Sequence, residues 1–487
     1  MIHTEKNCRV RSGLCRPVAV VIVWAFVLLA GCAVGPDYRK PEAESPAAYK
    51  ENVNWKVAQP QEAIVRGAWW KIFADPQLDA LVEQVNISNQ NIAAADAQYR
   101  QALAVVKAAR AGYFPTVTAG AQATRSLRSS NANSVAVVTS EANDFLVTGT
   151  ASWEPDIWGK VRRNVEANQA GAQASAADLE SIRLSSQALL AQNYFQLCAL
   201  DAQKALLEDT VAAYQKSLEL TKNRYAYGVA SRAEVLQAET QLKSTQAQAI
   251  DLGVQRSQLE HAIAVLIGKP ASVFSIPATP LSASPPAIPA GIPSELLERR
   301  PDIAAAERRV AAANAQIGVA EAAYYPSITL GATGGFESSD ISNWLSWPSR
   351  LWSIGLSLSQ TLFDAGLRSA LTDQARASYD ATVASYRQTV LTGFQEVEDN
   401  LAALRILESE SRVQDEAVKA ARGSLELSMN QYKAGTINYL AVVVVQAISL
   451  SNESTAVEIK GRRMVASALL IKAIGGGWDS SALPPGN

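Results

Sequence analysis

An internal duplication is the feature that most limits what this 487-residue chain can fold into. Matches early in the two copies lie 211 residues apart, and later matches lie 207 residues apart. The matched segments are 90–102 (QNIAAADAQYRQA) with 301–313 (PDIAAAERRVAAA), 112–121 (GYFPTVTAGA) with 323–332 (AYYPSITLGA), Gly159 with Gly366, and 224–228 (RYAYG) with 431–435 (QYKAG). Because a repeat is one structural unit used twice, both copies are expected to contain the same elements in the same order.

Each copy ends in a long stretch without proline. No proline occurs between Pro155 and Pro270 or between Pro348 and Pro484, and helix-forming Ala, Gln, Glu and Leu are frequent there. These stretches predict helical hairpins over about 160–267 and 367–474. The first helix of each hairpin, about 160–224 and 367–432, would be about 100 Å long at ~1.5 Å per residue.

The second hairpin carries a coiled-coil period. Its apolar residues are spaced by three or four, averaging 3.5, which indicates a left-handed supercoil and packing along the whole helix. These residues are Val383, Tyr386, Val390, Phe394, Val397, Leu401 and Leu404.

Four segments have the alternation of β-strands, near 115–127, 144–155, 326–337 and 351–363. The second segment has Phe145, Val147, Gly149, Ala151 and Trp153 on one face, and the last has Trp352, Ile354, Leu356, Leu358 and Leu362. The opposite face of the second segment carries Leu146, Thr148, Thr150 and Ser152, and that of the last carries Ser353, Gly355, Ser357, Ser359 and Thr361. An apolar face opposite a polar face fits a strand between lipid and a watery lumen, although a half-buried soluble sheet has the same period.

Four strands cannot close a membrane barrel, and an open edge cannot lie in lipid. The strands must therefore be completed by other chains. Two chains would give eight strands with a filled interior, and three would give twelve strands with room for a pore. A conducting role favours three chains.

The chain start resembles a bacterial lipoprotein signal. Arg9, Arg11 and Arg16 precede an apolar run from Val18 to Ala30, which is shorter than the ~20 residues of a membrane span. It ends in Leu29-Ala30-Gly31-Cys32, which resembles a lipobox. In such lipoproteins the chain is cut before the cysteine, which receives a diacylglycerol on its thiol and an acyl group on its new amine. The alternative is an ordinary signal with a chance cysteine.

The expected organisation has five parts. A signal peptide covers 1–31, the first repeat with its N-terminal segment covers 32–269, and a Pro- and Ser-rich connector covers 270–293. The second repeat covers 294–474, and a tail covers 475–487.

Several stretches, taken in their order along the chain, resemble the TolC-type outer-membrane efflux factors, and within them the NodT-type lipoprotein branch. The stretches are LAGCAVGPDY, WWKIFADPQLDALV, ERRPDIAAAERRVAAANAQIGVAEAAYYPSITL, LFDAGLR, FQEVEDNLAAL and IKAIGGGW. With the duplication, they extend over nearly the whole mature chain.

The resemblance implies a mainly α-helical protein with a membrane β-barrel part. A homotrimer would form a 12-stranded outer-membrane barrel that continues into a long periplasmic α-helical barrel, girdled by a smaller mixed domain. It would dock on a periplasmic adaptor protein fed by an inner-membrane RND-type pump, and pass drugs or other small toxic molecules without converting them. In the lipoprotein family Ala33, rather than Asp, after Cys32 favours the outer membrane.

The resemblance also assigns the hairpin turns to the periplasmic mouth. The exposed tips, expected to contact the adaptor, are Gly228, Val229, Ala230, Gly435, Thr436 and Ile437. Both glycines are also expected to end a helix.

The expected gate lies beside the tips. Tyr225 and Tyr432 are expected to face the mouth. Related proteins carry pore-ringing carboxylates in the second copy, where this chain has Ala441 and Val444, whereas the first copy keeps Glu234. The run Val442–Val445 predicts either an apolar constriction that gates by dewetting or plain packing between helices.

Other functions have little support in the sequence. The formal charge is −2 and becomes −5 without residues 1–31, which argues against nucleic acid as a partner. Two His and three Met make a metal site based on these residues improbable, and no cofactor besides lipid is expected. Glu396 and Asp399 are interpreted as a solvated helix face, and Cys198 as a small core residue. The alternatives to an efflux duct are a type I protein-secretion duct and a non-conducting structural periplasmic lipoprotein.

Overall fold

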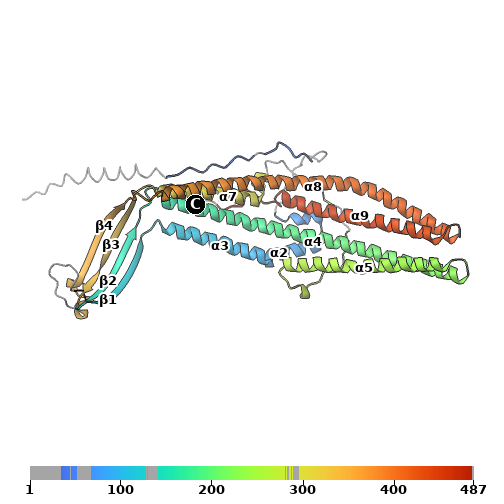
Figure 1. Cartoon of the computed structure of the whole chain (residues 1–487), viewed down its shortest axis with the longest axis horizontal. Helices are drawn as coiled ribbons and strands as arrows, with labels where there is room; N and C mark the ends of the chain where they lie inside the picture. The colour runs from blue at the N-terminus through green and yellow to red at the C-terminus, as the bar shows by residue number, and fades with distance from the viewer. Residues whose placement is uncertain are drawn as a thin grey trace, which may run out of the picture.

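The computed structural model describes residues 34–43, 45–51, 67–127, 129, 141–279, 281, 285–286, 288 and 296–484. Cys32, the expected signal peptide and much of the expected connector lie outside this part. The chain is elongated: the strands lie at one end, the long helices follow, and the two hairpin turns lie at the other end (Figure 1).

The two copies have the same elements in the same order. The first contains α3 (Gln90–Ala111), β1 (Thr116–Ser126), β2 (Ala142–Trp153), α4 (Lys160–Ala226) and α5 (Arg232–Leu266). The second contains α7 (Pro301–Ala322), β3 (Ser327–Ser338), β4 (Arg350–Ser359), α8 (Leu367–Lys433) and α9 (Tyr439–Ala473). Helices α4 and α8 have 67 residues each, so each is about 100 Å long.

The strands form one antiparallel sheet in the order β1-β2-β3-β4. Ala119 lies opposite Gly149 in the first hairpin, and Leu330 lies opposite Leu356 in the second. Adding the repeat offsets of 211 and 207 to the first pair gives the second pair. The duplication therefore extends to the hydrogen-bond register.

Two strand ends differ from the expected bounds. β2 ends at Trp153 and β4 ends at Ser359. The expectation that Leu362 belongs to the last strand was therefore wrong. The β3–β4 ladder stops because Ser359 is paired with Ser327, and the residue before Ser327 is Pro326, which has no N–H to donate.

Equivalent loops start the two long helices. Gly159 and Gly366 precede α4 and α8 with φ angles of 80° and 91°. The carboxylate of Asp156 accepts the amides of Val161 and Arg162, and that of Asp364 accepts those of Gly366 and Arg368. Both helix starts are thus capped by a carboxylate from the preceding loop.

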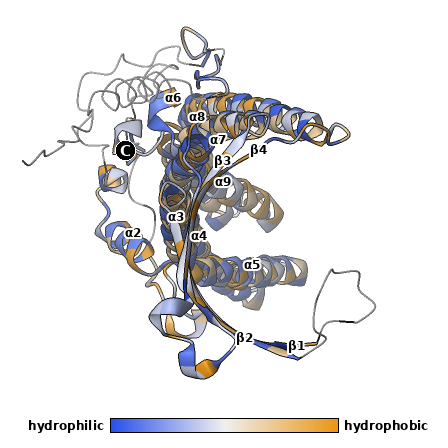
Figure 2. Ribbon diagram, turned by 90° about the vertical axis from the view of Figure 1, so that its left-hand side faces the viewer, coloured by the Kyte–Doolittle hydropathy of each residue, from blue (hydrophilic) through white to orange (hydrophobic). Residues whose placement is uncertain are grey.

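A girdle lies along one side of the long helices, near their middle (Figures 1 and 2). Its helical parts are η2 (Trp69–Phe73), α2 (Pro76–Ser88), η3 (Ala271–Val273), α6 (Leu296–Arg299) and η7 (Ser480–Ala482). The described residues of the girdle contain short helices and extended chain but no strand, so the mixed composition expected for this domain is absent there.

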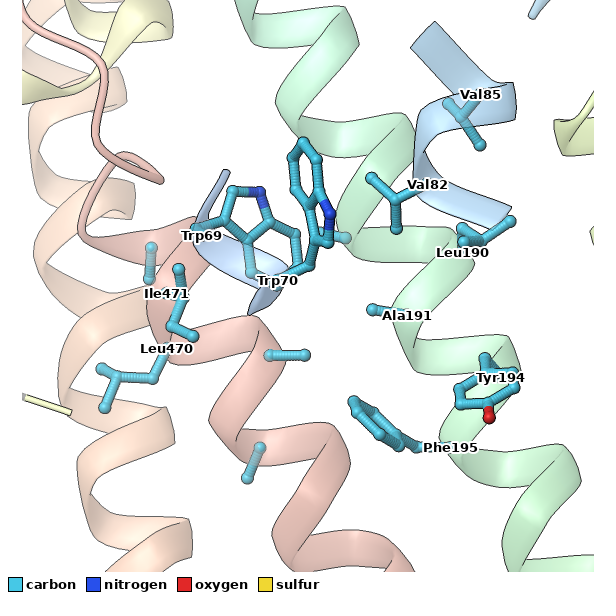
Figure 3. Close-up of a cluster of buried hydrophobic side chains, with 14 of the residues drawn as sticks. Trp69, Trp70, Val82, Val85, Leu190, Ala191, Tyr194, Phe195, Leu470 and Ile471 are labelled. Carbon is cyan, nitrogen blue, oxygen red and sulfur yellow. The ribbon is translucent and has the colours of Figure 1, made fainter. Parts of the chain in front are cut away.

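The largest core lies where the girdle meets the helices. Trp69 and Trp70 fit between α2, α4 and α9, against Val82, Leu190 and Leu470 (Figure 3). The Trp69 indole donates to Gln187 Oε1 at 3.0 Å, so its polar atom is satisfied inside the core. The coiled-coil residues predicted on α8 belong to the same core: Tyr386, Val390, Phe394, Val397, Leu401 and Leu404 are buried, and Val383 packs against them.

Cys198 is buried and free, as the sequence indicated. Burial raises the pKa of its thiol to about 12, so the thiolate is not formed near neutral pH.

Asp399 is exposed, as expected for a solvated helix face, whereas Glu396 is 33% exposed and ion-paired. Glu396 Oε2 accepts a hydrogen bond from Arg300 Nη1 at 2.8 Å, and Lys472 lies 3.6 Å from its other oxygen. The Arg300 side chain is buried, with Asp302 as a second partner. Sequence periodicity could not reveal this pair, because the partners lie about 100 residues apart.

An N-terminal strap, residues 34–43 and 45–51, runs along the helices from the strand end towards the girdle. The Val34 amide donates to the carbonyl of Trp158 at 3.1 Å, just below the sheet. Tyr38 hydrogen-bonds Glu307, and the amides of Lys50 and Glu51 donate to Glu398 on α8. The strap therefore connects both copies.

Candidate functional site

The two hairpin turns have the same backbone design. At the first, the amides of Gly228 and Val229 donate to the carbonyls of Tyr225 and Arg224. At the second, the amides of Gly435 and Thr436 donate to the carbonyls of Tyr432 and Gln431. Each glycine has a positive φ, 71° and 77°, which is the Schellman ending of a helix.

The following helices are capped as well. Ser231 accepts the amide of Glu234 at the start of α5, and Asn438 accepts the amide of Ala441 at the start of α9. The turns project at the far end of the molecule from the strands (Figure 1). Among the expected docking residues, Gly228, Val229, Gly435 and Thr436 are exposed, whereas Ala230 and Ile437 are half-buried.

A tip cluster of buried side chains joins the two hairpins just behind the turns. It consists of Tyr214, Leu218, Ala238, Leu242, Tyr432, Tyr439 and Val442. The Tyr432 and Tyr439 rings have centroids 5.3 Å apart, and burial raises the pKa of Tyr439 to about 12. The hairpins are therefore coupled inside one chain by an apolar contact.

Tyr432 does not face the mouth as expected. Its ring is 1% exposed within the tip cluster. Its hydroxyl lies 3.2 Å from Glu234 Oε2 and 3.3 Å from Thr221 Oγ1. The Arg224 guanidinium stacks over the ring at 4.6 Å from its centroid and donates to the Tyr432 carbonyl at 2.9 Å. Three residues of the first copy thus hold one tyrosine of the second.

The equivalent tyrosine of the first copy has a different environment. Tyr225 is about half exposed in this single chain. The repeat offset of 207 makes Gln431 and Ala441 the second-copy counterparts of Arg224 and Glu234. The two charged partners of Tyr432 are therefore not duplicated, whereas Thr221 has a hydroxyl counterpart in Ser428.

The run Val442–Val445 does not form one surface. Val442 is buried and Val443 packs against the tip cluster, so these two residues follow the packing alternative. Val444 is half exposed and lies on one helix face with Leu440 and Ile448, which are also about half exposed. This apolar stripe, Leu440–Val444–Ile448, was missed in the sequence. Its spacing of four residues was the signal that could have identified it.

Helix α9 contains an 18-residue window apolar enough to cross a membrane by length and composition. It packs beside α8 and α4 in the helical half, far from the strands (Figure 1). Its apolar character includes the stripe and the buried residues of the tip cluster.

The sheet has one apolar face and one hydroxyl-rich face. Residues opposite one another in a ladder share a face. The apolar face carries Val117, Val147, Trp153, Ile328, Leu330, Trp352, Ile354, Leu356 and Leu358. The other face carries Thr116, Thr118, Thr124, Thr148, Thr150, Ser152, Ser327, Thr329, Thr333, Ser353, Ser357 and Ser359.

The sheet is strongly curved, and α2 and α6 of the girdle lie on the side away from its opening (Figure 2). Trp352, Ile354 and Leu356 are each more than three-fifths exposed in this chain. Such an apolar face on a curved sheet fits contact with lipid, and the hydroxyl face fits a watery lumen.

Within the described residues there is no group of three or more His, Cys, Asp or Glu side chains that could hold a metal ion.

The family follows from these features together with direct sequence comparison. The family model "Outer membrane efflux protein" matches residues 81–269 and 292–476, one segment for each copy. The chain belongs to the outer membrane efflux protein family, whose members are channels and not enzymes.

Individual relatives cover nearly all of the chain. The probable efflux pump outer membrane protein TtgC of Pseudomonas putida is 30% identical over 460 residues, covering 94% of each protein. Outer membrane protein OprJ of Pseudomonas aeruginosa is 31% identical over 464 residues, covering 93% of this chain and 94% of that protein.

Solved structures agree with the fold. The outer-membrane channel OprN superposes with a TM-score of 0.85 at 30% identity, covering 92% of this chain and 100% of that chain. The open state of the Neisseria gonorrhoeae MtrE outer membrane channel gives a TM-score of 0.80 at 28% identity, covering 92% and 99%. The protein is therefore an outer-membrane channel of a bacterial efflux pump that extends into the periplasm, and the TolC-like fold is confirmed.

The contacts of Tyr432 generate a prediction. Tyr432→Phe removes the hydroxyl that reaches Glu234 and Thr221 while keeping the ring in the tip cluster. A hydrogen bond to a charged group contributes about 1.5–3 kcal/mol, so we expect the hairpins to separate more readily and the open probability in planar bilayers to rise about tenfold or more.

Tyr225→Phe is the matched control, because it removes the equivalent hydroxyl from a residue without these partners in the described chain. Equal open probability in Tyr432→Phe and wild type would show that the Tyr432 contacts do not hold the entrance closed.

Proposed function

We propose that three copies of this chain form the exit duct of a tripartite efflux pump, passing antibiotics, solvents or other small toxic compounds across the periplasm and outer membrane. The observation that carries this proposal is the pair of open sheet edges, β1 and β4, beside an apolar face that fits lipid. Unpaired backbone groups cannot remain exposed to hydrocarbon, so each edge requires another chain.

The helices are arranged in the same order as the strands, so the helical part also has two open sides. Near the strands, α3 packs on α4, α4 on α7 and α7 on α8. Towards the tips, α5 packs on α4, α4 on α9 and α9 on α8. One side of the chain thus consists of β1, α3 and α5, and the other of β4 and α8. Joining unlike sides head to tail produces a ring, and three copies supply twelve strands around a pore.

The repeat predicts how the subunits pair. Within the chain, β2 joins β3 with Gly149 opposite Gly334. Under the repeat offsets, Gly149 corresponds to Leu356 and Gly334 corresponds to Ala123. If the boundary between subunits repeats the boundary within one, Leu356 of one subunit lies opposite Ala123 of the partner subunit.

The pair Leu356→Cys with Ala123→Cys tests both the ring and its register. Opposite residues have Cβ atoms ~5 Å apart, so oxidation should join the subunits into a covalent trimer on denaturing gels. The control pair, Leu356→Cys with Ala119→Cys, is displaced by four residues and should not react. A mass of one or two chains for the conducting species in detergent would contradict the ring itself.

The strap supports lipidation of Cys32. Val34 is fixed beside Trp158, immediately below the strands, where the membrane surface would lie. Two residues of chain span at most about 7 Å, so a lipid attached to Cys32 would be within reach of the inner leaflet of the outer membrane.

Cys32→Ser is expected to abolish labelling with palmitate and to block cleavage of the signal, because both steps require the thiol. Membrane insertion should persist, since the sheet does not depend on the anchor. Equal palmitate label in the variant and wild type would remove Cys32 as the attachment site.

The lumen face fits a duct without tight selectivity. Most polar side chains of this face are Thr and Ser hydroxyls, which hydrate a passing molecule without charge, and its carboxylates, Asp144 and Glu337, lie at the end of the sheet away from the helices. We infer that selection takes place in an inner-membrane RND-type pump, reached through a periplasmic adaptor at the exposed tips, and that the Leu440–Val444–Ile448 stripe lines the closed entrance.

The tips provide the test of adaptor docking. Gly228→Asp with Gly435→Asp should stop efflux, because a buried unpaired carboxylate costs several kcal/mol at each of six sites in a trimer. The control is Gly228→Asn with Gly435→Asn, which enters the same left-handed backbone region without charge.

Drug accumulation in cells measures efflux, and crosslinking from Val229 and Thr436 measures adaptor contact. If the Asp variant shows the same drug accumulation and the same adaptor crosslinking as the wild type, the tips are excluded as the docking surface.

A further inference from the structure

The outer end of β4 carries a basic and aromatic group of side chains. Arg350 begins the strand, and its guanidinium lies 4.0 Å from the ring centroid of Trp347. Trp347 and Trp352 are nearly three-quarters exposed in this chain. Arg350 and Trp352 share the apolar face of the sheet, because their opposite residues Phe336 and Gly334 are both on that face.

The subunit register adds a second guanidinium. This step depends on the ring proposed above. Val147 lies opposite Phe336 within the chain. Under the repeat offsets, Val147 corresponds to Ile354 and Phe336 corresponds to Arg125, so Ile354 lies opposite Arg125 of the partner subunit. Arg125 belongs to the same face as Val117, because the two are eight positions apart on β1 and side chains alternate between faces.

The two guanidinium groups are therefore neighbours across the boundary. Arg350 and Ile354 are four residues apart on β4, so Arg350 and the partner subunit's Arg125 lie about 13 Å apart along the strand. Trp352 lies between them. By the same register, Leu127 of the partner subunit is opposite Trp352, and Leu127 is largely exposed in the single chain.

Arg125 already has one acidic neighbour. Its Nε donates to Glu141 Oε2 at 3.1 Å, and its Nη2 contacts the same oxygen. A guanidinium has five N–H donors in a fixed fork, so Nη1 remains able to bind a second anion. Glu141 reduces the net positive charge at this position.

We propose that each subunit boundary binds one molecule of bisphosphorylated lipid A in the outer leaflet. The group lies at the end of the sheet away from the helices and continues the lipid-facing band of Ile354, Leu356 and Leu358. Lipid A has acyl chains for that band and two phosphates on a disaccharide, and arginine is well suited to binding phosphate. A glycerophospholipid with one phosphate can contact only one of the two guanidinium groups.

Native mass spectrometry of the purified full-length protein, titrated with bisphosphorylated lipid A, tests the proposal. The wild type should bind up to three lipids per trimer. Arg125→Gln with Arg350→Gln should raise the half-saturating concentration about tenfold or more, because two charge-assisted contacts are lost. Glu141→Gln should lower it, and Arg125→Lys with Arg350→Lys should retain much of the binding.

Lys216→Gln with Lys222→Gln is the matched control, since it removes two charges from exposed positions on α4 far from the strands. Wild-type affinity in the Arg125→Gln/Arg350→Gln variant, or equal displacement by phosphatidylglycerol, would overturn the lipid A site. The same spectra give the oligomeric mass, so absence of a wild-type trimer would instead count against the ring.

Discussion

The requirement that backbone amides and carbonyls be paired governs this structure. A four-stranded sheet with an apolar face leaves two strands unpaired at its edges, and hydrocarbon offers no hydrogen bonds to replace the missing ones. The other elements that the structure describes are compatible with closure of the sheet into a ring. The girdle is outside the opening of the sheet, the long helices continue the same two edges, and the hydroxyl face is left for water (Figure 2).

The duplication gives the sheet two edges that can pair with each other. Sequence divergence between the two copies makes the contact within a subunit differ from the contact between subunits. The strand hairpins keep an identical register over both copies. The tips do not keep identical chemistry, because Tyr432 is held by Arg224 and Glu234 and the corresponding positions of the second copy are Gln431 and Ala441. At the tips of a ring, the boundary within a subunit would therefore contain the charged partners Arg224 and Glu234, whereas the boundary between subunits would have Gln431 and Ala441 in their places.

Much of the fold could be predicted from the sequence because its signals are periodic and long. The 3.5-residue spacing on α8 and the alternation on β2 and β4 extend over many residues, so local exceptions do not obscure them. The exact strand ends depended on single prolines and on the opposite strand. The positions of Tyr432 and Glu396 depended on residues about 100 or more positions away, to which periodicity is insensitive.

The candidate site was predicted less completely for the same reason. The turns were identified because glycine has a specific backbone role at Gly228 and Gly435. The gate residues were inferred from their correspondence to positions in related proteins. Such a correspondence does not show which face of a helix is buried. Val442 and Val444 are two residues apart, yet one is buried in the tip cluster and the other belongs to the exposed stripe.

The capped tips have a consequence for the kinetics of pump assembly. At both turns the helix ends are closed by backbone bonds, and the next helix begins with a side-chain cap. A surface that is ordered before contact loses little conformational entropy on binding. Docking at such tips is therefore close to rigid-body association, and its rate would be limited by the orientation of the two partners. Substitutions that weaken the contact would mainly increase the dissociation rate.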